Sequence, residues 1–360
     1  MRHFLERLTN IFVAILMVIF GVNFSRQITK ISVAEAQMGY AYGYYLSEDG
    51  TLYSPGANTD AGPYVHYASK WNSIVGENVV SFDIIVGGGL YVNADGDLVL
   101  WSQYKQPALG LVKTHCFVTV AHHVRYAEGG RTMLPYLDDH DRLLAIGEVD
   151  GQMYNMEAPK LLDENVQCLE RYNYYDDLIW IRKDGTIRIR GDEASVRRAA
   201  LLEKAVPAEQ LAKTEKVMVT ENAILLLASG NLWYAGDIGL LSGKEAAGET
   251  VQCLGSGITH FTADAEMVAA VDEAHRGILW GKVLANGPEE TEENIYEYWW
   301  KVPALENVRN VSGDSAFLSF VFDDGTTGCF HFRESAPFCG NSTDAQVVGL
   351  RNQPLTWVPK

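Results

Sequence analysis

The stretch that decides the fold is NVQCLERYNYYDDLIWIRKDGTIRIRG, from Asn165 to Gly191. Apolar and polar residues alternate over Ile187–Arg190, as they do in a strand with one buried and one solvated face. Asp184-Gly185 separates this run from a second apolar run, Leu178–Ile181, and an Asp-Gly pair in that position indicates a tight hairpin. A further strand is expected over Val166–Leu169. The stretch therefore predicts a small antiparallel sheet.

Three strands bury too little surface to offset the entropy of ordering them, so the unit must be repeated. Hairpin markers recur at steps of 46, 45, 44, 45, 47 and 48 residues. These markers are Gly50, Gly96, His140-Asp141, Gly185, Gly230, Gly277 and Gly325. A second marker announces the strand before each hairpin; it is Glu-Asn-Val at Glu77, Glu164 and Glu306, with degraded forms at His123-Val124, Lys216-Val217 and Thr250-Val251. The two markers predict seven copies in one array.

The two ends of the array look complementary. The first copy keeps its hairpin from Tyr44 onward, but its leading strand is incomplete. At the other end, Pro354–Val358 has the phase of a leading strand with no hairpin behind it. We therefore expect the carboxyl-terminal strand to complete the first copy and close a ring, which removes open sheet edges.

Several copies carry residues that resemble the repeats of the regulator of chromosome condensation family. Val308–Thr326 has the valine-led strand, glycine and Asp-Gly hairpin of that unit, Trp101–Gly110 keeps its Trp and Leu-Gly, and Leu279–Lys282 keeps its Trp-Gly. The resemblance covers about Gln37 to the end. It implies an all-β, seven-bladed propeller of four-stranded antiparallel blades. It also implies a binding role, because members act as exchange factors, chromatin adaptors or, in exported bacterial forms, enzyme inhibitors.

Residues 1–36 differ from the repeats. Arg2 and Arg7 precede an apolar run, Ile11–Phe24, that is short for a membrane span, and Ala34-Glu35-Ala36 offers small residues for cleavage. We interpret this segment as a secretory signal removed before Gln37, leaving 37–360 as a single propeller domain. The alternative is an uncleaved membrane anchor. Either way the repeats are expected outside the cytoplasm, extracellular or at the cell surface, with a membrane as partner only if the segment stays attached.

The charge of the chain bears on its partners. The formal net charge is −17, and removing residues 1–36 leaves 25 basic residues against 44 acidic ones. Nucleic-acid partners require a basic stripe that displaces counterions, and the sequence has none. The acidity has two readings, solubility of an exported protein or an acidic binding face.

Two connections between strands are unusual. Asp192–Glu215 is rich in Ala, Leu, Glu and Lys, so one or two short helices are expected there, with Asp192 as cap and Pro207 as breaker. Glutamates after Pro288 lead into IYEYWW, which ends at Trp300. This segment forms either an acidic-aromatic patch for a cationic or sugar ligand, or a fourth strand in which Tyr298 and Trp300 face the sheet interior; we favour the strand.

Candidate contact residues cluster between the first and second strands of the fourth copy, since Tyr and Arg are enriched in interface hot spots. The predicted binding residues are Arg171, Tyr172, Tyr174, Tyr175 and Asp176, together with Tyr104 and Trp299. The alternative is a loop that packs on its neighbours.

Enzyme chemistry is not predicted. The segments around His122 and Ser315 resemble those of trypsin-like proteases, but Ala316-Phe317 stands where an oxyanion hole needs glycines. The histidines show no metal-ligand spacing, and there is no phosphate-binding glycine loop, so no metal or cofactor is expected.

Five cysteines are an odd count for an exported chain. Cys168 and Cys253 each follow a strand marker by three residues and are expected to be buried free thiols. Cys329 and Cys339 lie in one copy and could form a disulfide, while Cys116 has no assigned role.

The sequence thus predicts a non-catalytic scaffold that recognises a protein through loops on one propeller face. Carbohydrate or cell-wall binding is the second hypothesis, suggested by aromatic residues that would have to be exposed. A hydrolase or lyase is the third, for which the sequence offers no convincing carboxylate pair.

Overall fold

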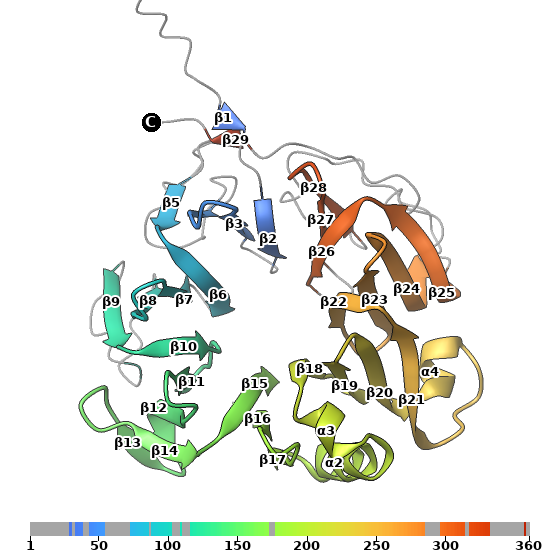
Figure 1. Ribbon diagram of the computed structural model, residues 1–360, viewed down its shortest axis with the longest axis horizontal. Coiled ribbons are helices and arrows are strands. Elements are labelled where there is room, and N and C mark those ends of the chain that lie inside the picture. Colours follow the sequence, from blue (N-terminus) through green and yellow to red (C-terminus); the bar gives the residue numbers. More distant parts are fainter. Residues whose placement is uncertain are drawn as a thin grey trace, which may run out of the picture.

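The structure is a computed structural model that describes residues 29–30, 33–38, 43–54, 73–85, 88–102, 109, 116–172, 177–284, 296–313, 317–331 and 356–357. These residues form antiparallel sheets that follow one another around a common centre (Figure 1). The chain is therefore an all-β propeller with antiparallel, mostly four-stranded blades. Within each sheet, the first strand in sequence lies innermost.

The strands of the first three sheets have the following bounds. The first sheet contains β2 (Val33–Met38), β3 (Gly43–Ser47), β4 (Leu52–Ser54) and β5 (Ser73–Gly76). The second contains β6 (Val79–Ile85), β7 (Gly88–Asn93), β8 (Leu98–Ser102) and β9 (Cys116–Ala121). The third contains β10 (Val124–Ala127), β11 (Met133–Asp138), β12 (Leu143–Val149), β13 (Gln152–Tyr154) and β14 (Lys160–Asp163).

The remaining sheets continue in the same direction around the centre. β15 (Val166–Tyr172), β16 (Asp177–Arg182) and β17 (Ile187–Arg190) form one sheet. β18 (Thr214–Val219), β19 (Ala223–Ala228), β20 (Asn231–Asp237) and β21 (Glu249–Ser256) form the next. β22 (Ile258–Ala263), β23 (Met267–Asp272), β24 (Arg276–Leu284) and β25 (Tyr296–Glu306) follow. The last sheet contains β26 (Val308–Ser312), β27 (Phe317–Phe322) and β28 (Thr327–His331).

The predicted count of seven four-stranded blades is not confirmed. Within the described ranges, four sheets have four strands, one has five and two have three, besides a separate two-stranded ribbon. The sheet that begins at β15 has no fourth strand there, because the chain leaves β17 for a helix instead.

Hairpin turns between the second and third strands fall where the repeat predicts. Gly50, Gly96, Gly185, Gly230 and Gly325 have positive φ, a conformation that glycine adopts without steric cost. Asp141 also has positive φ (60°), so the turn forms without a glycine there.

Three of the predicted markers are wrong. Lys216-Val217 lies within β18, whose first residue is already Thr214. Gly277 lies within β24, and the turn residue of that hairpin is His275, with φ 58°. Thr250-Val251 lies in β21, the outermost strand of its sheet, and the next leading strand begins only at Ile258. β21 is eight residues long and includes Thr250-Val251, the position at which the sequence pattern predicted the start of the next leading strand.

A backbone hydrogen bond joins most neighbouring sheets. The carbonyl of the turn residue accepts from the amide of the first residue of the next leading strand: Gly50 from Val79 (2.8 Å), Gly96 from Val124 (2.9 Å), Asp141 from Val166 (2.9 Å), Gly230 from Ile258 (2.9 Å) and His275 from Val308 (2.9 Å). This recurring bond fixes each sheet relative to the one before it.

Buried apolar residues fill the junctions between consecutive sheets. Trp101 of the second sheet is fully buried and meets Tyr44 of the first edge-on, with ring centroids 5.4 Å apart. Phe261, Trp280 and their neighbours form the corresponding cluster between the fifth and sixth sheets. Burial of each large apolar side chain contributes roughly 1.5–3 kcal/mol, so these junctions supply most of the stability of the ring.

The predicted closure by the carboxyl-terminal strand is not confirmed. β29 (Thr356–Trp357) pairs with β1 (Thr29–Lys30), and the leading strand of the first sheet is β2, which pairs with β3. The prediction assumed that cleavage removes residues 33–36, and with these residues present the place of the leading strand is already taken. β2 lies beside the last sheet, where Asn310 Nδ2 donates to the Ala34 carbonyl at 3.3 Å (Figure 1).

The helices predicted in the Asp192–Glu215 connection are confirmed. α2 (Glu193–Ala205) begins after Asp192, whose carboxylate accepts from the Ser195 amide at 2.7 Å, and α3 (Ala208–Leu211) follows Pro207. A third short helix, α4 (Ile238–Ser242), packs near β24 and β25. None of the described helices combines the length and apolar character needed to cross a bilayer.

Candidate binding channel

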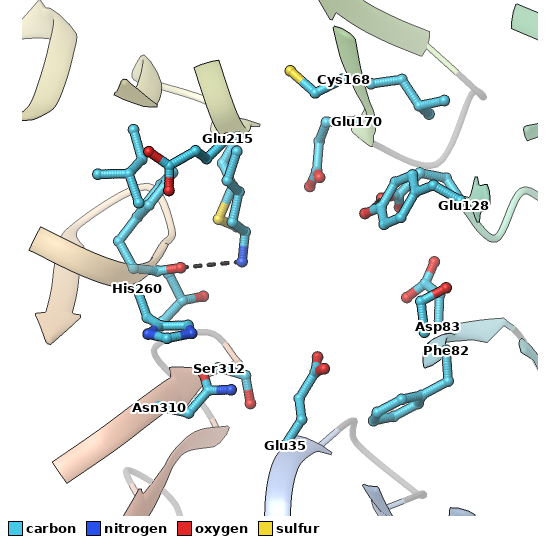
Figure 2. Close-up of a pocket in the computed structure, with 18 of the residues that line it drawn as sticks. Glu35, Phe82, Asp83, Glu128, Cys168, Glu170, Glu215, His260, Asn310 and Ser312 are labelled. Carbon is cyan, nitrogen blue, oxygen red and sulfur yellow. Dashed lines mark hydrogen bonds between the residues drawn. The ribbon is translucent and has the colours of Figure 1, made fainter. Parts of the chain in front are cut away.

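A cavity of about 700 Å³ lies at the centre of the ring, where the innermost strands meet (Figure 2). Side chains from the leading strand of every sheet line it. These strands are β2, β6, β10, β15, β18, β22 and β26. The cavity is thus a product of the whole ring rather than of any one sheet, and we call it the central channel.

One position of the leading strand supplies an acidic wall. Counting four residues from Val79, Val124 and Val166, the first residues of β6, β10 and β15, gives Asp83, Glu128 and Glu170. All three line the central channel, and their carboxyl groups point toward its interior (Figure 2). Three consecutive sheets therefore place a carboxyl group at the same count from the start of the leading strand, with Glu128 directly after the end of β10. We call these three residues the carboxyl wall.

Two members of the carboxyl wall, Asp83 and Glu128, influence each other through a side-chain hydrogen bond and through their charges, and each has further partners. Asp83 accepts hydrogen bonds from the backbone amides of Gly129 (2.6 Å) and Ile84 (2.7 Å), and the Tyr126 hydroxyl donates to Glu128. Burial, followed by the charges of Glu170 and Asp83, raises the pKa of Glu128 well above its ordinary value, and Glu128 is only 7% exposed. Burial also raises the pKa of Asp83, while the Gly129 amide acts in the opposite direction. Protons are therefore retained on this pair more readily than on carboxyl groups in water.

Glu170 completes the wall. Burial raises the pKa of Glu170 to about 8, although the positive charge of Lys216 opposes the shift. Its side chain keeps some accessible surface and lines the central channel. Glu170 consequently changes its charge close to neutral pH, unlike an ordinary glutamate.

The opposite side of the central channel carries His260, Asn310 and Ser312 (Figure 2), and Lys216 also lines the cavity. Lys216 Nζ donates to the Phe261 carbonyl at 3.1 Å and lies 5.4 Å from the centre of the Phe261 ring. Burial, and next the Lys216 charge, lowers the pKa of His260, which favours a neutral imidazole at pH 7.

Arg125, the second cationic residue that lines the channel, is engaged by backbone carbonyls and by a carboxylate. Arg125 donates to the carbonyls of Val166 (2.7 Å) and Gln167 (3.1 Å) and lies 3.3 Å from the carboxylate of Asp141. Against Arg125 and Lys216 stand five carboxyl groups of the lining: Glu35, Asp83, Glu128, Glu170 and Glu215. The central channel therefore favours a cationic ligand, such as an ammonium or guanidinium group, that can share protons and charge with the carboxyl wall.

A metal ion is a weaker match to this wall. Across the described ranges, no group of three or more His, Cys, Asp or Glu side chains is arranged to hold one.

The structure describes two of the five predicted binding residues of the fourth copy, Arg171 and Tyr172. Tyr172 ends β15, is only 7% exposed and packs over Gly191, where an added Cβ would lie 1.9 Å from its hydroxyl. Arg171 is next to Glu170 and its charge acts on the carboxyl wall. Tyr174, Tyr175 and Asp176 lie outside the described residues, as does Tyr104.

The aromatic segment of β25 is more exposed than expected. Tyr298 and Trp300 are 48% and 47% exposed, so the prediction that they face a sheet interior is wrong. Among the described strands β25 is the outermost of its sheet, and Tyr298 packs against Gly243 at the end of α4 while keeping about half of its surface exposed. Trp299 lies between them on β25, but its side chain is outside the described residues.

The predicted cysteine environments are partly wrong. Cys168 lines the central channel and is partly buried, whereas Cys253 is exposed on β21, because its sheet position was assigned from the misplaced Thr250 marker. Both are free thiols. The proposed Cys329–Cys339 disulfide involves side chains outside the described residues.

The carboxyl wall was missed at the sequence level although a signal for it exists. Asp83, Glu128 and Glu170 each stand five residues after a strand marker, at Asn78, His123 and Asn165. The markers served to count copies, and aligning the copies on them would have placed the three acids in one column.

Neither a known family model nor a curated protein sequence matches the chain. Solved structures do resemble it. Prp20p from Saccharomyces cerevisiae, the yeast RCC1, whose structure is described with its binding to Gsp1p and histones, aligns with TM-score 0.50 and 12% identity over 81% of this chain and 84% of that one. A chain of the Mitotic Checkpoint Complex aligns with TM-score 0.52 and 10% identity over 85% and 94%. At this identity the likeness concerns the fold, which is an RCC1-like β-propeller.

Proposed function

We propose that this protein is a non-catalytic binding scaffold for a protein partner, and that the central channel receives a basic side chain of that partner. The observation that carries the proposal is the carboxyl wall, Asp83, Glu128 and Glu170, repeated at one position of three consecutive leading strands. The cations that line the same cavity are engaged by backbone carbonyls or by Asp141. A ligand ammonium group would add a further positive charge to those of Lys216 and Arg171, which already act on the wall.

Two features of the chain support a protein rather than a nucleic acid as the source of this group. The net charge of −17 repels phosphate backbones, and it attracts the basic surface of a protein from a distance. Solved structures with the same fold include Prp20p, which is described as binding Gsp1p and histones, both proteins.

The test measures binding of a lysine-containing peptide, Gly-Lys-Gly-Lys-Gly, by calorimetry, with Gly-Gln-Gly-Gln-Gly as the uncharged comparison. Replacing all three wall acids (Asp83→Asn, Glu128→Gln, Glu170→Gln) should weaken lysine-peptide binding at least about tenfold. The affinity should also rise between pH 6 and pH 9, because the ionised form of Glu170 is the one that binds a cation.

A matched control separates the channel from the overall charge. Glu164→Gln, Glu273→Gln and Glu306→Gln replace the same number of carboxyl groups at exposed positions. If this variant loses as much affinity as the channel variant, or if neither loses any, the central channel is not the binding site.

Further features belong to the proposal. We place the scaffold outside the cytoplasm, on the basis of the basic and apolar composition of residues 1–30. We also infer that the array comprises seven copies of one four-stranded unit in the pattern of the regulator of chromosome condensation family; the leading strands that line the central channel and the recurring hairpin turns support this inference. Loops on one face would then frame the channel entrance and complete the contact with the partner.

A second candidate function is carbohydrate binding at the outer edge of the sixth sheet. Tyr298 and Trp300 lie two residues apart on β25, both half exposed, and such a pair can stack on a sugar ring. Tyr298→Ala with Trp300→Ala should abolish retention on a polysaccharide column and leave lysine-peptide binding unchanged. Retention of the double variant would exclude this edge as a sugar site.

A further inference from the structure

Residues just after the apolar run are part of the fold. Thr29 and Lys30 pair with Trp357 and Thr356 of the other terminus. From Val33 to Met38 the chain forms β2, which pairs along its length with β3, from Ser47 back to Gly43. The amino-terminal segment therefore enters the propeller well before Gln37, the position at which the sequence suggests cleavage.

β2 also links the first sheet to its neighbours around the centre. The Ala34 carbonyl accepts from Asn310 Nδ2 of the last sheet, and Glu35 contributes to the lining of the central channel. Cleavage before Gln37 would remove both residues and would leave β3 without most of its inner partner strand. Exposed strand edges of this kind are prone to misassembly, so such a cut would damage the protein that it releases.

The sequence offers no alternative site upstream. Signal removal requires small residues two positions apart. After the apolar run Ile11–Phe24, that spacing occurs at Ser32-Val33-Ala34 and Ala34-Glu35-Ala36, and both patterns overlap β2. From Phe24 to Ile28, Ser25 is the only small residue.

We propose that residues 1–28 are not removed and that they tether the propeller to a lipid bilayer with anionic headgroups. The 14 residues of the apolar run are fewer than the ~20 of a comfortable helical span, and basic residues stand on both sides of it. Arg7 and Arg26 flank the run, and basic side chains at the ends of a short apolar segment can extend to anionic headgroups. This proposal is independent of the ligand of the central channel.

The experiment expresses the full chain with a carboxyl-terminal tag in a secretion-competent host and measures the intact mass in the membrane and medium fractions. The expected result is an uncut chain in the membrane fraction, resistant to a high-salt wash but released by detergent. The control is Asn23→Ala with Ser25→Ala, which creates an Ala-Phe-Ala site before β1. This variant should release a folded propeller that begins at Arg26.

Two outcomes would overturn the proposal. One is a wild-type propeller in the medium that begins at Gln37 or at any other internal residue. The other is an uncut chain that stays in solution without detergent. Lysine-peptide binding by the released control variant tests the channel separately, so failure of one proposal does not affect the other.

Discussion

Glu170 connects the chemistry of the central channel to the stability of the ring. Its pKa is raised from 4.5 to about 8, so between these values the folded state holds a proton that the unfolded state has lost. Unfolding then releases a proton, and stability falls as pH rises through this window. If the Glu170 carboxyl is protonated in the free protein, it can release its proton when a cationic group of a partner binds beside it.

Glu170→Gln should flatten this pH dependence. The amide cannot ionise, so the variant should match the wild type near pH 5 and exceed its free energy of unfolding at pH 8, by on the order of 2 kcal/mol. Urea unfolding at the two pH values measures the difference. Glu164→Gln, at an exposed position, should leave the profile unchanged. A Glu170→Gln protein that is less stable than wild type at pH 8 would contradict a protonated Glu170.

Cys168 and Cys253 should differ sharply in reactivity. Burial raises the pKa of the Cys168 thiol to about 12, whereas Cys253 is exposed. Because the thiolate is the nucleophile, iodoacetamide at pH 8 should label Cys253 and leave Cys168 unlabelled in the native protein. Peptide mass mapping before and after unfolding in urea gives the result. Rapid native labelling of Cys168 would show that the central channel is more open than described.

At the scale of elements, α2 depends on its first residue. Asp192 caps the helix through the Ser195 amide, and loss of such a cap costs about 1 kcal/mol. Asp192→Ala should therefore lower the free energy of unfolding by that amount, while Asp192→Asn, which can cap equally well, should retain most of it. Urea titrations of the two variants decide the matter. Equal losses in both would mean that the carboxylate acts through its charge rather than as a cap.

The same scale shows which elements the sequence could predict. Turns and caps were predictable because one or two residues determine them: positive φ at Gly185, or the Asp192 side chain at a helix start. The start of the leading strand at Ile258 was not predictable, since it depends on how far β21 extends along β20. That extent is set by a tertiary contact. Predicting the carboxyl wall would have required the register of each leading strand and the knowledge that the ring brings these strands together.

At the scale of the whole molecule, polar side-chain contacts help to hold the last sheet to the first. Asn310 donates to the Ala34 carbonyl of β2, and Arg309 pairs with Glu48. Polar contacts that solvent can reach contribute little, and an ion pair is weakened by salt. We therefore expect this junction to open more readily as salt is added.

Hydrogen exchange tests that expectation. Backbone amides of β2 should exchange about tenfold faster or more than those of β16, which lies between two other strands in the middle of the chain. The difference should grow with added salt, because the Arg309–Glu48 pair is screened. Uniform exchange of the two strands would indicate a ring that unfolds as one unit.

The bond from a turn carbonyl to the next leading strand, which joins most neighbouring sheets, has an evolutionary consequence. It uses atoms that every amino acid possesses, so substitution at the turn does not remove it; Asp141 and His275 serve as well as glycine. Selection can then rewrite nearly every side chain while the architecture persists. In such a protein the repeat spacing and the backbone geometry can persist after sequence identity has been lost. The same scaffold can then acquire unrelated ligands.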